Sequence, residues 1–185
     1  MLEFNTFTAQ LEEVFAGKRT LLDVSTNFAL DDVIEAFYST RPRVIEALES
    51  LTDAQVAFTS SVHPFWSISE TITHLVFSQG LYLNKLLDIS TSQLPHAVEA
   101  ARGMGEGAKT GIPADELRQK LAAATAHLND VIEGTRHSHD PEKTETDSFF
   151  GVCNYKVWMM LLLTHELDHL RQLLAMRRVA RTEAH

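Results

Sequence analysis

Hydrophobic residues recur at helical spacing in four stretches of the chain. The first predicted helix begins near Leu30, where Asp31 and Asp32 are placed favourably for a helix N-terminus. Its apolar positions are Val33, Phe37, Val44, Ile45, Leu48 and Leu51. Pro42 interrupts this pattern, because proline lacks an amide hydrogen and clashes with the preceding turn. We therefore expect either a kink or two abutting helices in this stretch.

The second and third predicted helices have clearer start signals. Ser67 and Glu70 match the S-x-x-E capping box, in which the two side chains satisfy exposed backbone amides, and the apolar pattern then runs to about Ile89. The third helix begins after Pro113, a residue tolerated in the first helical turn, and ends near Gly134. Its apolar positions are Leu117, Leu121, Ala124, Leu128, Val131 and Ile132.

A fourth helix is predicted from about Asn154 to Ala180, and two loops complete the outline. The stretch Arg102–Gly111 contains four glycines and no hydrophobic periodicity. The stretch Thr135–Ser148 is polar and charged, which predicts a second long loop. No segment shows the two-residue alternation and turn punctuation of a β-strand.

These elements predict an all-α protein, most simply a four-helix bundle over residues 29–185. Residues 1–28 form an N-terminal extension in this interpretation, with a short extra helix around Thr8–Phe15. The length of 185 residues suits one domain that buries a substantial core.

Charge and cysteine content narrow the function classes. Sixteen Lys and Arg against twenty-five Asp and Glu give a formal charge of −9, which argues against nucleic acid and anionic membranes as partners. The single cysteine, Cys153, excludes an internal disulfide and any cysteine-built metal site. The longest strongly apolar run, Trp158–Leu163, is far shorter than the about 20 residues of a membrane span. Met1–Phe7 lacks the features of a secretory signal, so we expect a cytoplasmic protein.

Two of the nine histidines share one face of the fourth predicted helix. His165 and His169 are four residues apart, so they lie about 40° apart around the helix axis and can converge on one ion. Gln172 lies on the same face. The alternative is that both rings find ordinary hydrogen-bond partners or reach the surface, which is the more common fate of such a pair.

The residues His165–His169 also match H-E-x-x-H, the zincin motif in which the glutamate activates a zinc-bound water. The metzincin continuation requires glycine at position 172 and histidine at position 175, where this chain has Gln172 and Ala175. Zincins also place the substrate against an edge strand, and no strand is predicted. A metallohydrolase of this type is therefore disfavoured.

His74 in the second predicted helix is the best candidate for a third ligand. It lies nearly opposite the aliphatic stripe of its helix, just as His165 and His169 lie opposite a leucine stripe formed by Leu163, Leu167, Leu170 and Leu174. If the two histidine-bearing faces meet, three imidazoles surround a cleft. Periodicity alone leaves this meeting open.

The chain resembles the DinB/YfiT-like superfamily of metalloenzymes over about residues 30–180. Trp66–Leu75 resembles the motif W-S-x-x-E-x-x-x-H-L, and His165–Gln172 resembles a later H-x-x-x-H-x-x-Q block that follows Phe149–Gly151. The resemblance implies a four-helix bundle and a divalent metal, commonly nickel or zinc, on three histidines that map onto His74, His165 and His169. It also implies a low-molecular-weight thiol as co-substrate, since characterised members include thiol-dependent transferases.

The resulting hypothesis is a metal ion, bound by these three histidines, that activates a thiol or water for attack on a small electrophilic molecule. Gln172 and Glu166 are the candidate catalytic residues. Glu166 is either a base or a solvated acid, and Glu70 either orients His74 or, more naturally, caps its helix. One alternative is a non-catalytic metal- or ligand-binding bundle. Another is an interaction protein whose leucine seam pairs two subunits as a homodimer.

The remaining candidates carry less weight. Cys153 is interpreted as an ordinary buried residue, with a thiol of lowered pKa at a helix N-terminus as the alternative. The other histidines are expected to be solvated or isolated, and they are His63, His96, His127, His137, His139 and His185.

Overall fold

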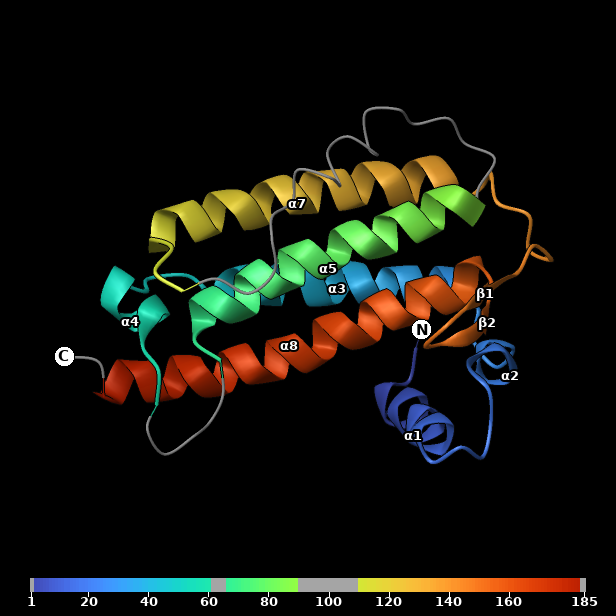
Figure 1. Ribbon diagram of the computed structural model, residues 1–185, viewed down its shortest axis with the longest axis horizontal. Coiled ribbons are helices and arrows are strands. Elements are labelled where there is room, and N and C mark those ends of the chain that lie inside the picture. The colour runs from blue at the N-terminus through green and yellow to red at the C-terminus, as the bar shows by residue number, and fades with distance from the viewer. Residues whose placement is uncertain (1, 61–65, 90–109, 184–185) are drawn as a thin grey trace.

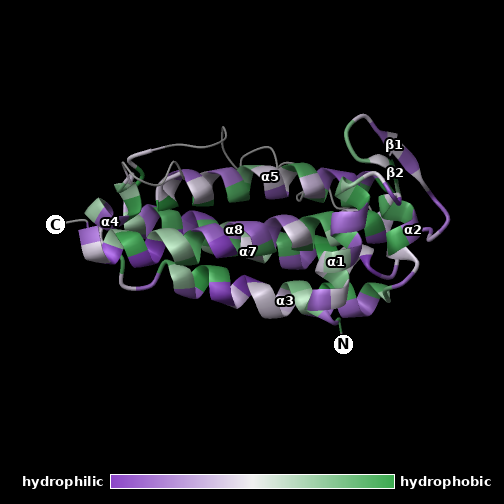
Figure 2. Cartoon of the chain, turned by 90° about the horizontal axis from the view of Figure 1, so that it is seen from below, coloured by the Kyte–Doolittle hydropathy of each residue, from purple (hydrophilic) through white to green (hydrophobic). Residues whose placement is uncertain are grey.

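Four long helices form the body of the protein in the computed structural model, which describes residues 2–60, 66–89 and 110–183 (Figure 1). The helices are α3 (Leu30–Ala47), α5 (Ile68–Ile89), α7 (Ala114–Thr135) and α8 (Tyr155–Glu183). Both α8 and α7 pack against α3 and α5, so the four helices close around one interior. The predicted all-α four-helix bundle is confirmed. Figure 2 shows hydrophobic and hydrophilic residues alternating in bands along these amphipathic helices.

Buried side chains inside the bundle form two hydrophobic clusters, one toward each end. One cluster includes Phe37, Leu83 and Trp158, and the other includes Val44, Ile72 and Leu173. Buried polar side chains lie between the two clusters along α3, α5 and α8, at Arg41, Gln79 and Glu166. The middle of the bundle is therefore polar, and this layer adjoins the histidine-bearing parts of α5 and α8.

The predicted helix boundaries are close to the observed ones. Ser67 and Glu70 form the expected capping box, since the Glu70 amide donates to Ser67 Oγ over 3.2 Å and the Ser67 amide donates to Glu70 Oε2 over 2.8 Å. Pro42 lies inside the continuous helix α3. The alternative of two abutting helices is therefore wrong, because flanking turns and burial on both sides of Pro42 keep the segment helical.

Within the described ranges, three shorter helices lie outside the bundle: α1 (Phe4–Phe15), α2 (Leu21–Ser25) and α4 (Asp53–Ala57). The helix expected around Thr8–Phe15 corresponds to α1, whereas α2 and α4 were not predicted. Helices α1 and α2 place side chains in the same hydrophobic cluster as the adjacent end of the bundle, and these are Phe7, Leu11, Leu21 and Val24.

A small antiparallel hairpin corrects the prediction that Thr135–Ser148 is entirely loop. Strand β1 (Glu145–Asp147) pairs with β2 (Gly151–Cys153), and Thr146 lies opposite Val152. Asp147 Oδ1 accepts the amides of Phe149 and Phe150, and Gly151 adopts a φ of 76° that favours glycine. Strands of three residues are too short to produce a recognisable alternation, which explains why the sequence pattern missed them.

Two further predictions meet the structure only in part. Most of the loop predicted over Arg102–Gly111 lies outside the described residues, while residues 110–113 lead into α7 without regular structure. In the leucine stripe of α8, Leu163 and Leu170 are buried in the bundle, whereas Leu174 is exposed. None of the helices in the described ranges combines the length and apolarity that crossing a bilayer requires.

Candidate metal centre

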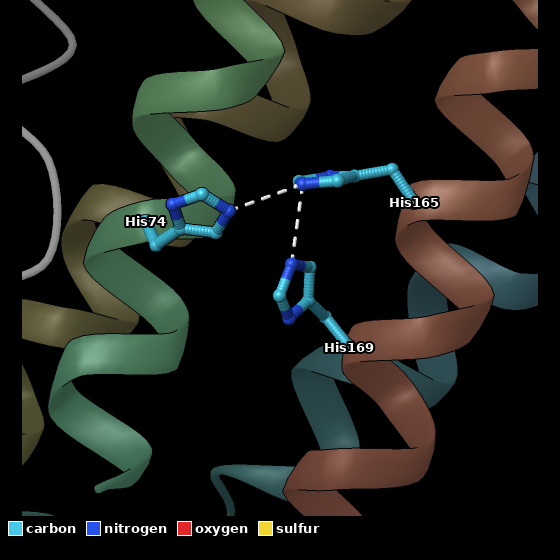
Figure 3. Close-up of side chains that lie close together, drawn as sticks. All are labelled: His74, His165 and His169. Atoms are coloured by element: carbon cyan, nitrogen blue, oxygen red, sulfur yellow. Dashed lines mark hydrogen bonds between the residues drawn. The ribbon is translucent and has the colours of Figure 1, made fainter. Parts of the chain in front are cut away.

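Three imidazoles from two helices point toward one another in the middle of the bundle (Figure 3). The Nε2 atom of His165 lies 3.2 Å from Nε2 of His74 and 3.1 Å from Nε2 of His169. We call these three residues the histidine cluster. The structure thus brings together the three histidines that the sequence singled out, from α5 and from two successive turns of α8.

The spacing of these nitrogens suits a small divalent ion. Nitrogen ligands at about 2.0–2.1 Å in a tetrahedral arrangement lie about 3.3 Å from one another. The ligand atoms of the histidine cluster all lie within 4.8 Å of one another. Among the described residues, no other group of three or more His, Cys, Asp or Glu side chains has its ligand atoms this close together. Three nitrogen ligands leave a coordination position open, which is typical of catalytic rather than structural metal sites.

A hydrogen bond with Gln172 fixes the orientation and the tautomer of the His169 ring. Its Nδ1 lies 3.0 Å from Gln172 Oε1, which can only accept a hydrogen bond. Nδ1 of His169 therefore carries the proton, and Nε2 turns a lone pair toward His165 and His74. Gln172, a candidate catalytic residue in the sequence, is placed by the structure where it orients the ring of His169.

His74 and His165 are oriented mainly by packing. The Trp66 ring meets His74 edge-on at a centroid distance of 4.9 Å, and the Tyr82 ring lies 5.6 Å from His165. Ser78 Oγ lies 3.3 Å from Nε2 of His74. The Nδ1 atom of His165 is buried and has no hydrogen-bond partner within the described residues. Apart from its contacts with the other two histidines, the His165 ring is thus held by packing.

The electrostatics of the site favour neutral rings. Burial lowers the pKa of all three imidazoles, because it penalises the charged form. For His165, burial together with the neighbouring His169 and His74 lowers the pKa to about 3. All three rings are therefore neutral at pH 7 and keep the lone pairs that a metal ion requires, so the residues present fit a divalent metal.

Glu166, the second candidate catalytic residue, has a different environment from the histidines. Its carboxylate is fully buried and accepts hydrogen bonds from Arg41 Nη1 over 2.8 and 3.1 Å and from Gln79 Nε2 over 2.9 Å. Burial raises the pKa of Glu166, and the Arg41 guanidinium opposes this effect. The alternative of a solvated acid is therefore wrong, and the observed contacts of Glu166 are with Arg41 and Gln79.

Arg41 is a residue that the sequence interpretation missed. Besides Glu166, it donates from Nη2 to Gln79 Oε1 and from Nε to Thr125 Oγ1, each over 2.8 Å. We call Arg41, Gln79, Thr125 and Glu166 the polar layer. A signal existed in the sequence, because Arg41 falls between Phe37 and Val44 on the apolar face of its helix, where a charged side chain needs a buried partner.

The other candidates take no part in the site. Glu70 Oε2 accepts hydrogen bonds from the amide and hydroxyl of Ser67, so it caps α5, and in the described part of the chain it makes no hydrogen bond with His74. Cys153 is buried, and burial raises its pKa to about 11, so the alternative of a lowered thiol pKa is wrong.

The other histidines within the described ranges lie apart from the cluster. His139 stacks on Tyr155 at a centroid distance of 4.2 Å, and His137 is exposed. His127 is half-buried. Three others, His63, His96 and His185, fall outside the described residues.

Comparison with known proteins identifies the family to which the chain belongs. No curated protein matches the chain. The family model of the DinB superfamily matches residues 36–173, a range that includes the whole histidine cluster, the polar layer and most of the bundle. On this match and the all-α bundle, the chain belongs to the DinB superfamily.

Proposed function

We propose that the protein is a metal-dependent enzyme in which His74, His165 and His169 hold a divalent ion, nickel or zinc, and that it acts on a small electrophilic molecule. The observation that carries this proposal is the convergence of three neutral Nε2 atoms on one point. Membership of the DinB superfamily supports it. Nitrogen-only ligands are compatible with both metals.

The residues around the ion have distinct roles in this proposal. A divalent metal held by three imidazoles lowers the pKa of a thiol or water, so that thiolate or hydroxide becomes available near neutral pH. Gln172 keeps Nδ1 of His169 protonated and the ring oriented. Ser78, next to His74, offers a hydroxyl that can hydrogen-bond a reacting group. Because Cys153 is buried and protonated, a reacting thiol would arrive as a low-molecular-weight co-substrate.

The second candidate is a metal-binding bundle without turnover. One observation favours it: Glu166, the glutamate of the H-E-x-x-H match, is engaged by Arg41 and Gln79 and is not free to transfer protons. The same observation argues against a metallohydrolase of the H-E-x-x-H type, in which this glutamate would activate water.

Metal content is the first test. Protein purified without a metal-affinity tag is offered zinc or nickel, desalted and analysed for bound elements. We expect about one ion per chain, and single alanine substitutions of His74, His165 or His169 should reduce this at least tenfold while helical content measured by circular dichroism stays unchanged. His127→Ala is the matched control. Less than about a tenth of an ion in the unsubstituted protein would overturn the proposal.

A second measurement separates the enzyme from the binding module. Metal-loaded protein is incubated with small thiols and a panel of electrophiles, and thiol consumption is followed against the His169→Ala variant. Consumption that depends on the histidine cluster supports the enzyme. Equal rates with and without the cluster favour the bundle without turnover.

A further inference from the structure

A cavity of about 340 Å³ lies beside the histidine cluster, where α5, α8 and the hairpin meet. Two of its lining residues also contact the cluster. Ser78 Oγ lies 3.3 Å from Nε2 of His74, and the Tyr82 ring lies 5.6 Å from the ring of His165. Ser78 and Tyr82 therefore connect the cavity wall to the histidine cluster.

The apolar part of the cavity wall is built mainly from aromatic rings. Phe150 meets Trp158 edge-to-face at a centroid distance of 5.9 Å, and Tyr82 lies 6.2 Å from the same Trp158 ring. Leu81 lines the cavity as well and is 55% exposed. Because the rings pack against one another, this wall is formed before any ligand arrives.

The charged side chains of the wall are largely occupied with one another. Lys85 Nζ lies 3.0 Å from Glu145 Oε1 and 3.8 Å from Asp147 Oδ2, and it sits 5.2 Å over the Trp158 ring. Asp147 also accepts two backbone amides of the hairpin. Asp88 adds another carboxylate to the lining, so the charged groups around Lys85 are acidic in sum and disfavour an anionic ligand.

We infer that this cavity is the substrate subsite of the proposed metal centre and that it takes a neutral aromatic or compact apolar group. The inference rests on the proposed function and specifies its substrate class. A volume near the lower end of the range for ligand sites suits one ring and its substituents rather than a long chain. The reactive end of such a molecule would reach the histidine cluster past Ser78 and Tyr82.

The test compares three thiol probes on the zinc-loaded full chain by isothermal titration calorimetry. Benzyl mercaptan carries a neutral ring, 4-(mercaptomethyl)benzoate carries an anionic ring, and 2-mercaptoethanol carries no ring. We expect benzyl mercaptan to bind at least about tenfold more tightly than either of the other two, because only its ring gains from the apolar wall without meeting the acidic groups.

Neighbouring phenylalanines provide a matched pair of variants. Phe150→Ala removes a ring that lines the cavity and should reduce the preference for benzyl mercaptan about fivefold or more. Phe149→Ala removes the same side chain from the adjacent residue, which is 84% exposed, and should leave the preference unchanged. Leu81→Glu, at an exposed helix position, should also reduce the preference and avoids disturbing the packing around Trp158.

Zinc content is measured on the same samples, so the metal centre and the substrate subsite are tested separately. A protein that takes up no zinc contradicts the proposed function and, with it, this inference. A zinc-loaded protein that binds all three thiols equally, or in which Phe149→Ala and Phe150→Ala have the same effect, overturns the subsite alone.

Discussion

The polar layer and the histidine cluster are two groups of buried or half-buried polar side chains in the middle of one bundle. They differ in how completely the donors and acceptors within each group are paired. In the polar layer, donors face acceptors: the Arg41 guanidinium meets the Glu166 carboxylate and the side-chain oxygens of Gln79 and Thr125. In the histidine cluster, nitrogen faces nitrogen at 3.1 and 3.2 Å. The first group is complete by itself, whereas the second has the donor set to hold a cation.

The two groups are also neighbours along the same helices. Glu166 directly follows His165 on α8, and Gln79 lies five residues after His74 on α5. Arg41 on α3 joins these two helices at the level of the histidines through Glu166 and Gln79. The comparison indicates that the role of a polar residue in a bundle core depends on its hydrogen-bond partners rather than on its residue type. A satisfied group holds helices together, and an unsatisfied one indicates a ligand.

Breaking the polar layer should have the largest effect on stability. Arg41→Met leaves the Glu166 carboxylate buried without its cation, and we expect the free energy of unfolding to fall by about 3–5 kcal/mol. Urea denaturation followed by circular dichroism measures this. Arg118→Met is the control, since its pair with Asp115 is exposed and should contribute less than about 1 kcal/mol. Equal losses in the two variants would show that the polar layer is not a specially stabilising group.

Filling the histidine cluster should stabilise the folded protein. Zinc at about 100 times its dissociation constant should raise the free energy of unfolding by about 2.7 kcal/mol, because the ion binds the folded chain only. The gain should vanish in His165→Ala and persist in His127→Ala. Denaturation with zinc and with a chelator measures it. If His165→Ala keeps the gain, the stabilising ion lies elsewhere.

The contact between His169 and Gln172 should affect the metal affinity of the site but should not be required for metal binding. Gln172→Ala removes the acceptor that holds Nδ1 of His169, and we expect metal affinity to fall about 10–100-fold. Gln172→Glu keeps an acceptor oxygen and should restore most of the affinity. Competition with a chromophoric chelator gives both values. A Gln172→Ala variant with unchanged affinity would remove Gln172 from the site.

Mildly acidic pH should destabilise the folded protein through the histidine cluster. The pKa of His165 is about 3 in the folded protein and about 6.5 in an unfolded chain, so the unfolded state takes up protons first as the pH falls. The stability contributed by neutral His165 is complete above about pH 6.5 and is lost progressively between about pH 6.5 and pH 3.

Metal-free protein should therefore lose about 1 kcal/mol of stability through His165 between pH 7.5 and pH 5.5. Denaturation midpoints at the two pH values, compared with those of His165→Phe, isolate this part. The variant should show a flatter dependence on pH. An identical slope would mean that His165 is already protonated, or is solvated, in the folded chain.

Local signals in the sequence were sufficient for most helices. The capping box at Ser67 and Glu70 marked the start of α5 because its hydrogen bonds join residues only three apart. The same kind of signal precedes the short helices that were missed: Thr20 with Asp23 before α2, and Thr52 with Gln55 before α4. These helices have five residues each, too few to show an apolar period, so the cap alone was the available evidence.

The sequence by itself determined the four amphipathic helices and the pairing of His165 with His169, because helical geometry places residues four apart on one face. Only the tertiary structure decided that His74 completes the cluster, that Glu166 meets Arg41 instead of the histidines, and that Phe150 closes a cavity against Trp158. The first two contacts join residues about 90 or more positions apart along the chain, and the third joins the hairpin to the helix that follows it. The way two helices approach each other depends on how all the apolar faces pack together, and this packing cannot be predicted from a local sequence pattern.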